Sequence, residues 1–309
     1  MWLLLALACI SEPASKSADS AAPALAPLEL PPPTFIDAVP GRLVAVGDVH
    51  GDFRAAKRAL RLAGAIDDDA QWIGGDLVVV QTGDQLDRGD QEEKILELFE
   101  RLAVDAHAAG GAFYSLLGNH EVLNVELDFR YVTEGGFADF ADTPHDPDDP
   151  LLADLAPEER GRGAAFMPGG PWAVSLAGHN VLMVIGDSAF VHGGILPDHI
   201  DFGLPKINRQ THEWMLGERA APEVLSGDDA PVWTRRYSDD DEAEPDCETL
   251  AAVVEALGVS RIVVGHTVQD RANSACDGQV WRIDVGMAAY YDGVPMAIAI
   301  EDGEVTVLE

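Results

Sequence analysis

Short apolar runs recur along this chain, and each is followed within a few residues by a glycine and a polar side chain. The runs at residues 43–46, 77–80 and 112–117 are typical of strands buried on both faces. Between them, residues 53–63 and 91–107 predict helices. Three consecutive strand–helix units indicate a sheet with parallel neighbours, so that the strand ends share one rim.

The second half of the chain is richer in predicted strands. They are expected at residues 173–177, 181–185, 189–191, 261–264, 280–283, 296–300 and 305–308, with helices near 206–218 and 248–257. This order predicts an α/β fold, in which two central sheets with helices outside them form a four-layer α-β-β-α sandwich. Ligand sites of open α/β sheets lie at the C-terminal rim of the strands.

Residues 124–171 break this rhythm, because they mix short helical pieces with an acidic, proline-bearing run at 142–150. We interpret this segment as an insertion that lies over the rim. The insertion would belong to a single domain that extends from residue 41 to residue 309.

The charge of the chain limits its binding partners. It has 54 Asp and Glu residues against 20 Lys and Arg residues, and a net charge of −34. Such a surface repels phosphate at long range, which disfavours binding to nucleic acid or to anionic lipid. A phosphate-bearing substrate would therefore need a strong local source of positive charge.

Residues 1–33 are typical of a targeting segment followed by a disordered tether. Residues 2–8 are apolar but too short to span a bilayer, and Ala8-Cys9 resembles the lipobox of a bacterial lipoprotein. Residues 11–33 are rich in Pro, Ala and Ser and lack periodicity. We expect a lipid anchor at Cys9 and a place in the bacterial cell envelope, anchored or periplasmic. Without processing of this segment, the protein would stay in the cytoplasm.

Two cysteines remain after Cys9, namely Cys247 and Cys276. In an oxidising compartment they could form one disulfide. Two cysteines alone leave that pairing open.

Five loops at predicted strand ends carry carboxylate, imidazole or amide side chains. One histidine at a strand end is usually structural, but five loops that repeat the pattern indicate one shared site. Mixed ligands of this kind suit Mn, Fe or Zn better than Mg or Ca. The residues are Asp48 and His50; Asp84, Asp87 and Arg88; Asn119 and His120; His192; and His266.

The motifs GDVHG, GDQLDRG, GNHE, HGG and GHT follow one another in this order. This order resembles the calcineurin-like metallophosphoesterases, and specifically the phosphoprotein phosphatase branch. Residues 124–132, 231–235 and 276–286 are similar to the Shewanella-like protein phosphatase subgroup. The resemblance covers the chain from Gly41 to its C-terminus, and it implies removal of phosphate from phosphorylated proteins or peptides, with phosphotyrosine favoured.

The resemblance also implies a site for two divalent metal ions, with Mn favoured and Fe or Zn as alternatives. Two such ions about 3.5–4 Å apart clamp phosphoryl oxygens and acidify a bridging water into a hydroxide nucleophile at neutral pH. Asp84 is the expected bridge, because a carboxylate has two oxygens. By the resemblance, Asp48 and His50 complete the first metal site, and Asn119, His192 and His266 complete the second.

His120 is the expected general acid. Asp87 would hold its other ring nitrogen and keep the imidazole protonated; alternatively, Asp87 only pairs with Arg88. The guanidinium of Arg88 offers a planar fork that matches phosphate oxygens. Arg235 is a candidate for a second phosphate clamp, and its neighbour Arg236 is the alternative.

Aromatic residues in the inserted segment are candidates for the wall of a phenyl phosphate pocket, or else for core positions. They are Phe129, Tyr131, Phe137 and Phe140.

Two other functions compete with protein dephosphorylation. A dinucleoside polyphosphate hydrolase would share the first three loops, but residues 233–235 and 276–278 argue against it. A non-enzymatic alternative is a tethered scaffold that binds metal or phosphate, although the complete ligand set and the acid argue against a dead site. The sequence does not indicate an oligomeric state.

Overall fold

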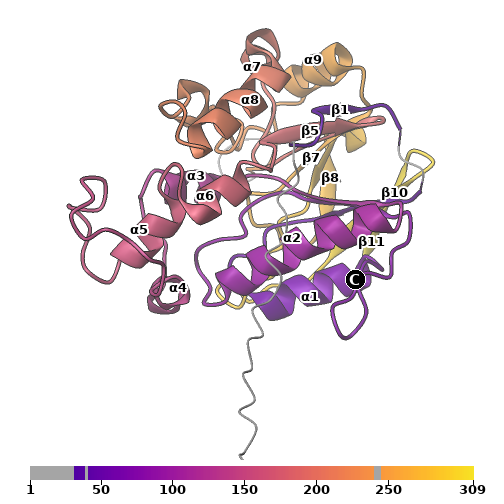
Figure 1. Cartoon of the computed structure of the whole chain (residues 1–309). Helices are drawn as coiled ribbons and strands as arrows, with labels where there is room; N and C mark the ends of the chain where they lie inside the picture. Colours follow the sequence, from indigo (N-terminus) through magenta and orange to yellow (C-terminus); the bar gives the residue numbers. More distant parts are fainter. Residues whose placement is uncertain (1–30, 39–40, 240–244) are drawn as a thin grey trace, which may run out of the picture.

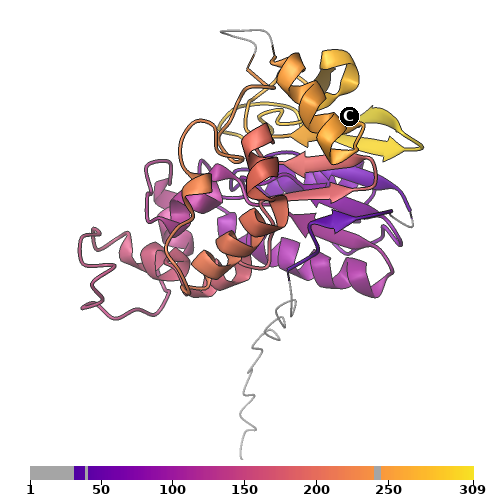
Figure 2. The same cartoon turned by 90° about the horizontal axis from the view of Figure 1, so that it is seen from above.

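The computed structural model describes residues 31–38, 41–239 and 245–309, which form two β-sheets with helices outside them (Figures 1 and 2). The five-stranded sheet has the order β11-β10-β2-β3-β4. Strands β2, β3 and β4 are parallel, as the strand–helix repeats predict, whereas β10 and β11 are antiparallel. The strands are β2 (Leu43–Val46), β3 (Val78–Gln81), β4 (Ala112–Ser115), β10 (Ala297–Glu301) and β11 (Glu304–Leu308).

The six-stranded sheet has the order β1-β5-β6-β7-β9-β8. Strands β6, β7 and β9 are parallel to one another, so their C-terminal ends lie at one edge. The strands are β1 (Phe35–Ile36), β5 (Leu182–Ile185), β6 (Ser188–Val191), β7 (Arg261–Val264), β8 (Asn273–Ala275) and β9 (Val280–Arg282).

The two sheets pack face to face, which the alternation of side chains along β5 shows. Met183 and Ile185 lie in the buried cluster that contains Val44 of the other sheet. Leu182 and Val184 lie in a second cluster, formed with helices. Because successive side chains of a strand point to opposite faces, both faces of β5 are covered. This double burial explains why the strand is a continuous apolar run.

Helices form the two outer layers (Figure 1). Leu60 of α1 (Phe53–Leu62) and Ile95 of α2 (Glu92–Ala108) pack on the five-stranded sheet. The six-stranded sheet is covered by α6 (Pro171–Leu176), α8 (Leu204–Met215) and α9 (Cys247–Leu257). The predicted four-layer α-β-β-α sandwich is therefore confirmed. Shorter elements are α7 (Pro197–Phe202) and the 3-10 turns η1 (Glu223–Leu225) and η2 (Cys276–Gly278).

The strand predicted at residues 173–177 is wrong, because this segment belongs to helix α6. Pro171 stands at the start of the helix, where its missing N–H costs nothing. Ala173 and Leu176 are buried three residues apart, while Val174 between them is 40% exposed. The apolar run is thus one face of a short helix, and a run of this length does not distinguish the two structures.

The segment at residues 124–171 contains the end of α3 (Asn119–Val125), then α4 (Glu134–Asp139) and α5 (Arg160–Phe166). In Figure 1, α4 and α5 lie to the left of the two sheets. The boundaries of the insertion and of the domain stay predictions.

A disulfide joins Cys247, the first residue of α9, to Cys276, the first residue of η2, with 5.3 Å between their Cα atoms. The pairing that the sequence leaves open is therefore present. The predicted signal segment, its anchor at Cys9 and most of the tether lie outside the described residues. Within the described ranges, no helix combines the length and apolarity needed to cross a membrane.

Candidate active site

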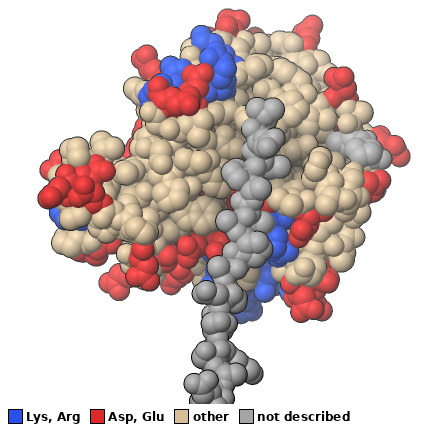
Figure 3. Space-filling view, in the orientation of Figure 1, with Lys and Arg blue, Asp and Glu red and all other residues tan. Residues whose placement is uncertain are grey.

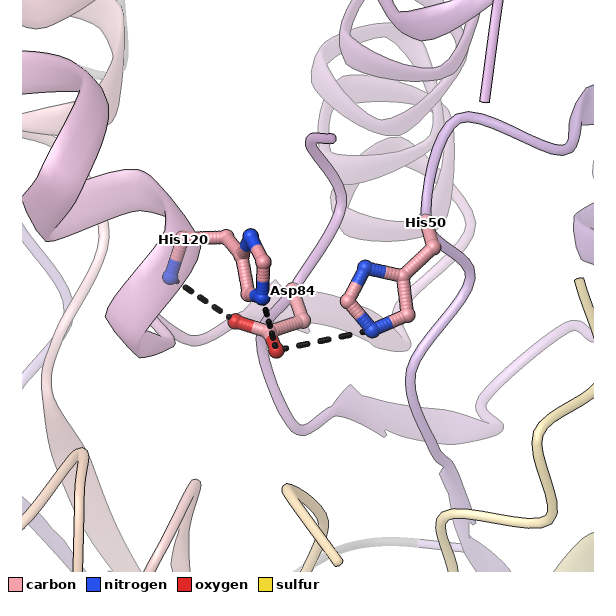
Figure 4. Close-up of side chains that lie close together, drawn as sticks. All are labelled: His50, Asp84 and His120. Carbon is pink, nitrogen blue, oxygen red and sulfur yellow. Dashed lines mark hydrogen bonds and ion pairs between the residues drawn. The ribbon is translucent and has the colours of Figure 1, made fainter. Parts of the chain in front are cut away.

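The loops that follow β2, β3, β4, β6 and β7 meet at one edge of the sandwich, with Asp84 at their centre. Its Oδ2 atom lies 3.2 Å from His192 Nε2, 3.6 Å from His50 Nε2 and 3.7 Å from His120 Nε2. Figure 4 shows His50 and His120 on either side of this carboxylate. All four side chains are buried. The sheets therefore bring together the histidines that the sequence scatters over 143 positions, from residue 50 to residue 192.

Several of these residues have an unusual backbone conformation. His50, Asp84, Asp87, Arg88 and His266 all have positive φ, between 40° and 67°. Residues other than glycine adopt this region at a cost, and such strain concentrates at functional sites. The clustering in the rim loops supports a functional role for these residues.

Gly83 permits the close approach of two of these loops. Its φ is 98°, and a Cβ atom there would lie 2.5 Å from the backbone N of Gly118. The glycine after β3 therefore meets both a conformational and a steric requirement.

Glu121 holds the Asp84 loop in place, and sequence reasoning missed this residue. Its buried carboxylate accepts hydrogen bonds from the backbone N–H groups of Gly118, Asp84 and Gln85, at 2.7, 2.8 and 2.8 Å. Glu121 is the last residue of the GNHE motif and directly follows His120, so the motif could have pointed to it. The side chain connects the β3 and β4 loops and fixes where Asp84 lies.

Three histidines each have one ring nitrogen beside a backbone carbonyl. His50 Nδ1 lies 3.1 Å from Leu86 O, and His192 Nδ1 lies 2.9 Å from Thr82 O. His266 Nε2 lies 3.0 Å from Trp233 O. Because a carbonyl only accepts, each of these nitrogens donates its proton, and the other ring nitrogen keeps a lone pair. Metal-binding histidines are oriented in this way.

Two oxygen acceptors, from Asn119 and Asp48, lie near these histidines. The side-chain oxygen of Asn119 lies 2.9 Å from His192 Nε2, so two acceptors meet. Asp48 Oδ1 is buried and has no hydrogen-bond partner among the described residues, while Asp48 Oδ2 accepts from the N–H of His266 at 3.0 Å. Converging acceptors without donors are what a cation requires, so the residues present fit a metal.

The candidate ligands group around two positions that share Asp84. Ligand atoms of His50, Asp84 and His120 lie within 4.8 Å of one another, and so do those of Asp84, His192 and His266. The geometry thus adds His120 to the residues near the first position, where the family resemblance implies Asp48 instead. His120 differs from the three histidines above in that a carboxylate, and not a backbone carbonyl, holds its other ring nitrogen.

His120 and Asp87 form a buried pair. His120 Nδ1 lies 2.5 Å from Asp87 Oδ2. Burial lowers the pKa of His120, but the charge of Asp84 and the hydrogen bond to Asp87 outweigh it and raise the pKa to about 9. The imidazole thus favours its protonated form at neutral pH, and nearby divalent cations would act in the opposite direction. Asp87 also binds Arg162, so the alternative that it serves only Arg88 is wrong.

Arg88 lies between two tyrosine rings. Its guanidinium carbon is 4.2 Å from the ring centre of Tyr131 and 4.7 Å from that of Tyr290. Its Nη1 donates to the Tyr290 hydroxyl at 3.1 Å. Tyr291 lies 5.4 Å from the ring of His50. Sequence reasoning missed Tyr290 and Tyr291, which stand in an irregular loop between β9 and β10 without a pattern to mark them.

Of the four aromatic residues proposed for the pocket wall, Tyr131 lies at the site, 5.1 Å from the ring of His120. Phe140 is a core residue with 1% exposure, packed on Phe166. Phe129 and Phe137 pack on each other at 5.9 Å. Phe140 is therefore wrong as a pocket wall, because it fills the space between α4 and α5.

Arg235 and Arg236 point to different partners. Arg235 Nη1 donates to the carbonyl of His266 at 2.9 Å and to Thr267 Oγ1 at 2.8 Å. Arg236 pairs with Asp229 on the surface at 2.9 Å. Arg235 is thus the residue of the two that lies beside a candidate metal ligand.

Asp284 is a second buried acid at the rim that sequence reasoning missed. Burial raises its pKa to about 6. Burial and the neighbouring charges of Asp284 and Asp84 also raise the pKa of Asp48. Asp284 follows β9 as Asp48 follows β2, so the rule of polar residues at strand ends applies to it as well. These adjacent carboxylates make the rim a favourable place for positive charge.

Similar proteins are found by sequence and by structure. Residues 41–270 match the family of calcineurin-like phosphoesterases. Shewanella-like protein phosphatase 2 of Arabidopsis thaliana is 39% identical over 294 residues, covering 84% of this chain and 75% of that protein. Shewanella-like protein phosphatase 1 of Plasmodium berghei is 24% identical over 279 residues, covering 86% and 73%. The solved structure of a cold-active protein tyrosine phosphatase has a TM-score of 0.71 at 25% identity, covering 91% and 82%.

Proposed function

This chain belongs to the calcineurin-like metallophosphoesterases, among the Shewanella-like protein phosphatases, and from this we propose that it removes phosphate from phosphorylated proteins or peptides, with phosphotyrosine preferred. The arrangement around Asp84 carries the proposal. Histidine lone pairs, carboxylates and an amide oxygen converge there, next to a histidine that keeps a proton. Such a site suits hydrolysis of a phosphate ester, because it can hold cations and also protonate a leaving group.

The residues present fit two divalent ions that share Asp84. Bound there, the ions would clamp phosphoryl oxygens and acidify a water molecule between them. Imidazole, carboxylate and amide ligands favour Mn, with Fe or Zn as alternatives. From the family resemblance we propose Asp48 and His50 as further ligands of the first ion. Asn119, His192 and His266 would be further ligands of the second.

Two arginines would bind the remaining phosphate oxygens. Arg88 is held between the rings of Tyr131 and Tyr290 and donates to the Tyr290 hydroxyl, so its planar fork is positioned before substrate arrives. Arg235 stands on the other sheet's side, beside His266. This local positive charge matters because the net charge of the chain is −34. Figure 3 shows acidic side chains around the margin of one face, together with smaller basic clusters.

His120 would complete the reaction by proton transfer. As the bond between phosphorus and the leaving oxygen breaks, the electron pair stays on that oxygen and takes the proton of His120 Nε2. The oxygen of a water molecule forms the new bond to phosphorus, so the products are inorganic phosphate and a free hydroxyl group. Asp87 holds the Nδ1–H side of the ring and keeps Nε2 directed toward Asp84.

Three tyrosines support a preference for an aromatic substrate. Tyr131, Tyr290 and Tyr291 lie around Arg88 and His50, and Tyr290 is 58% exposed. A phenyl ring that carries phosphate to this rim would pack against aromatic side chains, which contributes about 0.5–1.5 kcal/mol beyond buried area. The structurally similar protein tyrosine phosphatase points in the same direction.

We expect a higher kcat/KM for phosphotyrosine peptides than for phosphoserine or phosphothreonine peptides of the same sequence. Tyr290→Leu should reduce the ratio of kcat/KM for phosphotyrosine over phosphoserine peptides by about tenfold, because the loss of one aromatic contact corresponds to about that factor. Shortening the exposed acidic run at 142–150 should leave it unchanged. Phosphate release at matched ionic strength measures the three values, since an acidic surface repels acidic peptides.

Other outcomes of this assay decide between functions. Equal values for the three phosphoamino acids would remove the tyrosine preference and keep the phosphatase. Faster turnover of a dinucleoside tetraphosphate would favour the polyphosphate hydrolase. If the metal-loaded protein released no phosphate from any substrate, the remaining alternative would be a scaffold that binds metal or phosphate without turnover.

We further propose export to the cell envelope with a lipid anchor at Cys9. The Cys247–Cys276 disulfide supports this proposal, because such bonds persist in oxidising compartments. The mature protein should lack its first eight residues and partition into detergent, and Cys9→Ala should abolish both effects. Mass spectrometry of the N-terminus is the measurement, with Cys247→Ala as the control that keeps Cys9. An intact Met1 on the purified wild-type protein would contradict export.

A further inference from the structure

Arg162 of α5 is fully buried although it carries a charge. Its Nη2 lies 3.2 Å from Asp87 Oδ1 and 3.2 Å from Glu92 Oε1, and its Nη1 binds Glu92 Oε2 and the carbonyl of Gly136. Its Nε donates to Asn124 Oδ1 at 2.7 Å. A charged side chain is rarely buried unless it is paired in this way. The cost of burying it calls for a reason beyond stability.

We infer that Arg162 is a positioning residue for His120, acting through Asp87; the inference rests on the proposed role of His120 as general acid. Asp87 has two oxygens with separate partners. Its Oδ2 faces His120 Nδ1 at 2.5 Å, while Oδ1 accepts from Asn124 Nδ2 at 3.0 Å and from Arg162. Arg162 and Asn124 thus fix the plane of the carboxylate, and the carboxylate fixes the imidazole.

The positive charge of Arg162 has a second effect on Asp87. Asp87 and Glu92 are both buried, and Arg162 Nη2 lies 3.2 Å from an oxygen of each, so two carboxylates stand close together. Arg162 lies between them and offsets their repulsion. Without the guanidinium, like charges in a poorly solvated place would push the carboxylates apart. Asp87 would then lose the orientation in which it holds His120.

The sequence around Arg162 is built for close packing. A Cβ atom on Gly161 would lie 2.5 Å from the carbonyl oxygen of Phe140, and one on Gly163 would lie 2.5 Å from Leu155 Cδ1. Glycines on both sides therefore let α5 approach its neighbours closely enough to enclose the arginine. The rings of Phe140 and Phe166, each 5.1 Å from the guanidinium carbon, complete the enclosure. Segment 124–171 thereby contributes a buried side chain to the rim, in addition to Asn124 and Tyr131.

The test compares leaving groups. Arg162→Met keeps the unbranched stem as far as the position of Nε and removes the charged fork, so the acid should be misplaced. We expect kcat on phenyl phosphate to fall about 10–100-fold, as is usual when a residue that orients a functional side chain is lost. On dinitrophenyl phosphate, whose leaving group needs little protonation, the loss should stay within about threefold. Metal content should equal that of the wild type, and Arg162→Lys, which keeps the charge, should restore part of the rate.

Arg261→Met is the matched control. Arg261 is also buried and paired, but with Asp187 and Ser188 at the end of β7 away from His266. This variant should lower the midpoint of thermal unfolding and leave the ratio of the two kcat values unchanged. If Arg162→Met does not fold, Asn124→Ala removes the other hydrogen bond to Asp87 Oδ1 and should change the ratio in the same direction.

Equal losses on both phosphate esters, in a folded variant with full metal content, would overturn the positioning role and leave Arg162 as a structural residue. A wild-type protein that hydrolyses neither ester would instead refute the proposed function, and the positioning role with it. The two failures are therefore distinguishable in one experiment.

Discussion

Asp84→Asn is expected to remove bound divalent metal and phosphatase activity together. The carboxylate lies within 3.7 Å of three histidine nitrogens, so its charge serves both proposed ion positions. An amide has no net charge, and its NH₂ group would donate to His192 Nε2, occupying the lone pair meant for a metal. We expect a loss of several kcal/mol of transition-state stabilisation, about 10³-fold or more in rate.

Metal analysis, phosphate release and thermal unfolding check this prediction. The thermal unfolding measurement distinguishes loss of metal from loss of the fold. The fold should persist, because the amide oxygen of Asn can still accept the backbone N–H of His120, as Asp84 Oδ1 does at 3.1 Å. The substitution also removes a charge that stands near Asp48 and Asp284. Burial acts to raise the pKa of Asp84, but the neighbouring histidines nevertheless hold this pKa well below its usual range, so the ionised carboxylate stabilises the fold at neutral pH. In metal-free protein, the variant should therefore unfold at a lower temperature than the wild type, but still in one cooperative transition.

Asp187→Asn is a suitable control, because Asp187 pairs with Arg261 away from the rim. It should keep metal and activity. Full activity of the wild type after removal of all metal would contradict the mechanism. An Asp84→Asn variant with unchanged metal content and unchanged activity would contradict it as well.

The rim and its principal residues could be predicted because they depend on local pattern. A buried strand reads as an apolar run, and a glycine after it permits the turn that Gly83 makes with φ of 98°. Parallel strands place such turns at one edge, so His50, Asp84 and His192 could be assigned to one site before any contact was known.

The residues that support the site could not be predicted in the same way. Arg162 meets Asp87 across 75 positions, and Tyr290 meets Arg88 across 202. Nothing in the local sequence of either partner specifies such a distant neighbour. Asp284 is different: it follows a predicted strand, and the rule that found Asp48 would have found it too.

The error at α6 has a physical cause of its own. Residues 173–177 are apolar enough for a strand, and Pro171 before them fits the first turn of a helix. Tertiary packing selects the helix over the strand, because Ala173 and Leu176 face the same buried cluster. Short apolar runs are the least determined part of this fold.

His120→Asn should keep the metals and slow the reaction by about 10²–10⁴-fold, the usual contribution of a positioned acid. The reason lies in the two sides of the ring. Nδ1 is bound to Asp87 at 2.5 Å, which leaves Nε2, 3.7 Å from Asp84 Oδ2, to carry the mobile proton. Asparagine can still contact Asp87 but offers no acidic proton to the leaving oxygen.

His120 also lies in the group with His50 and Asp84 that could hold an ion, so it could be a metal ligand and not an acid. Comparing substrates with different leaving groups distinguishes the two roles. An acid matters least for a leaving group that departs without a proton, so the loss should shrink from phenyl phosphate to dinitrophenyl phosphate. Asp87→Asn should shift the same ratio, and the double variant should lose little more than His120→Asn alone, because both changes disable one unit. His199→Asn, a buried histidine on α7, is the matched control and should change neither rate. Loss of one equivalent of metal in His120→Asn, with equal losses on both esters, would show that His120 is a ligand and leave the leaving oxygen without a proton donor from this loop.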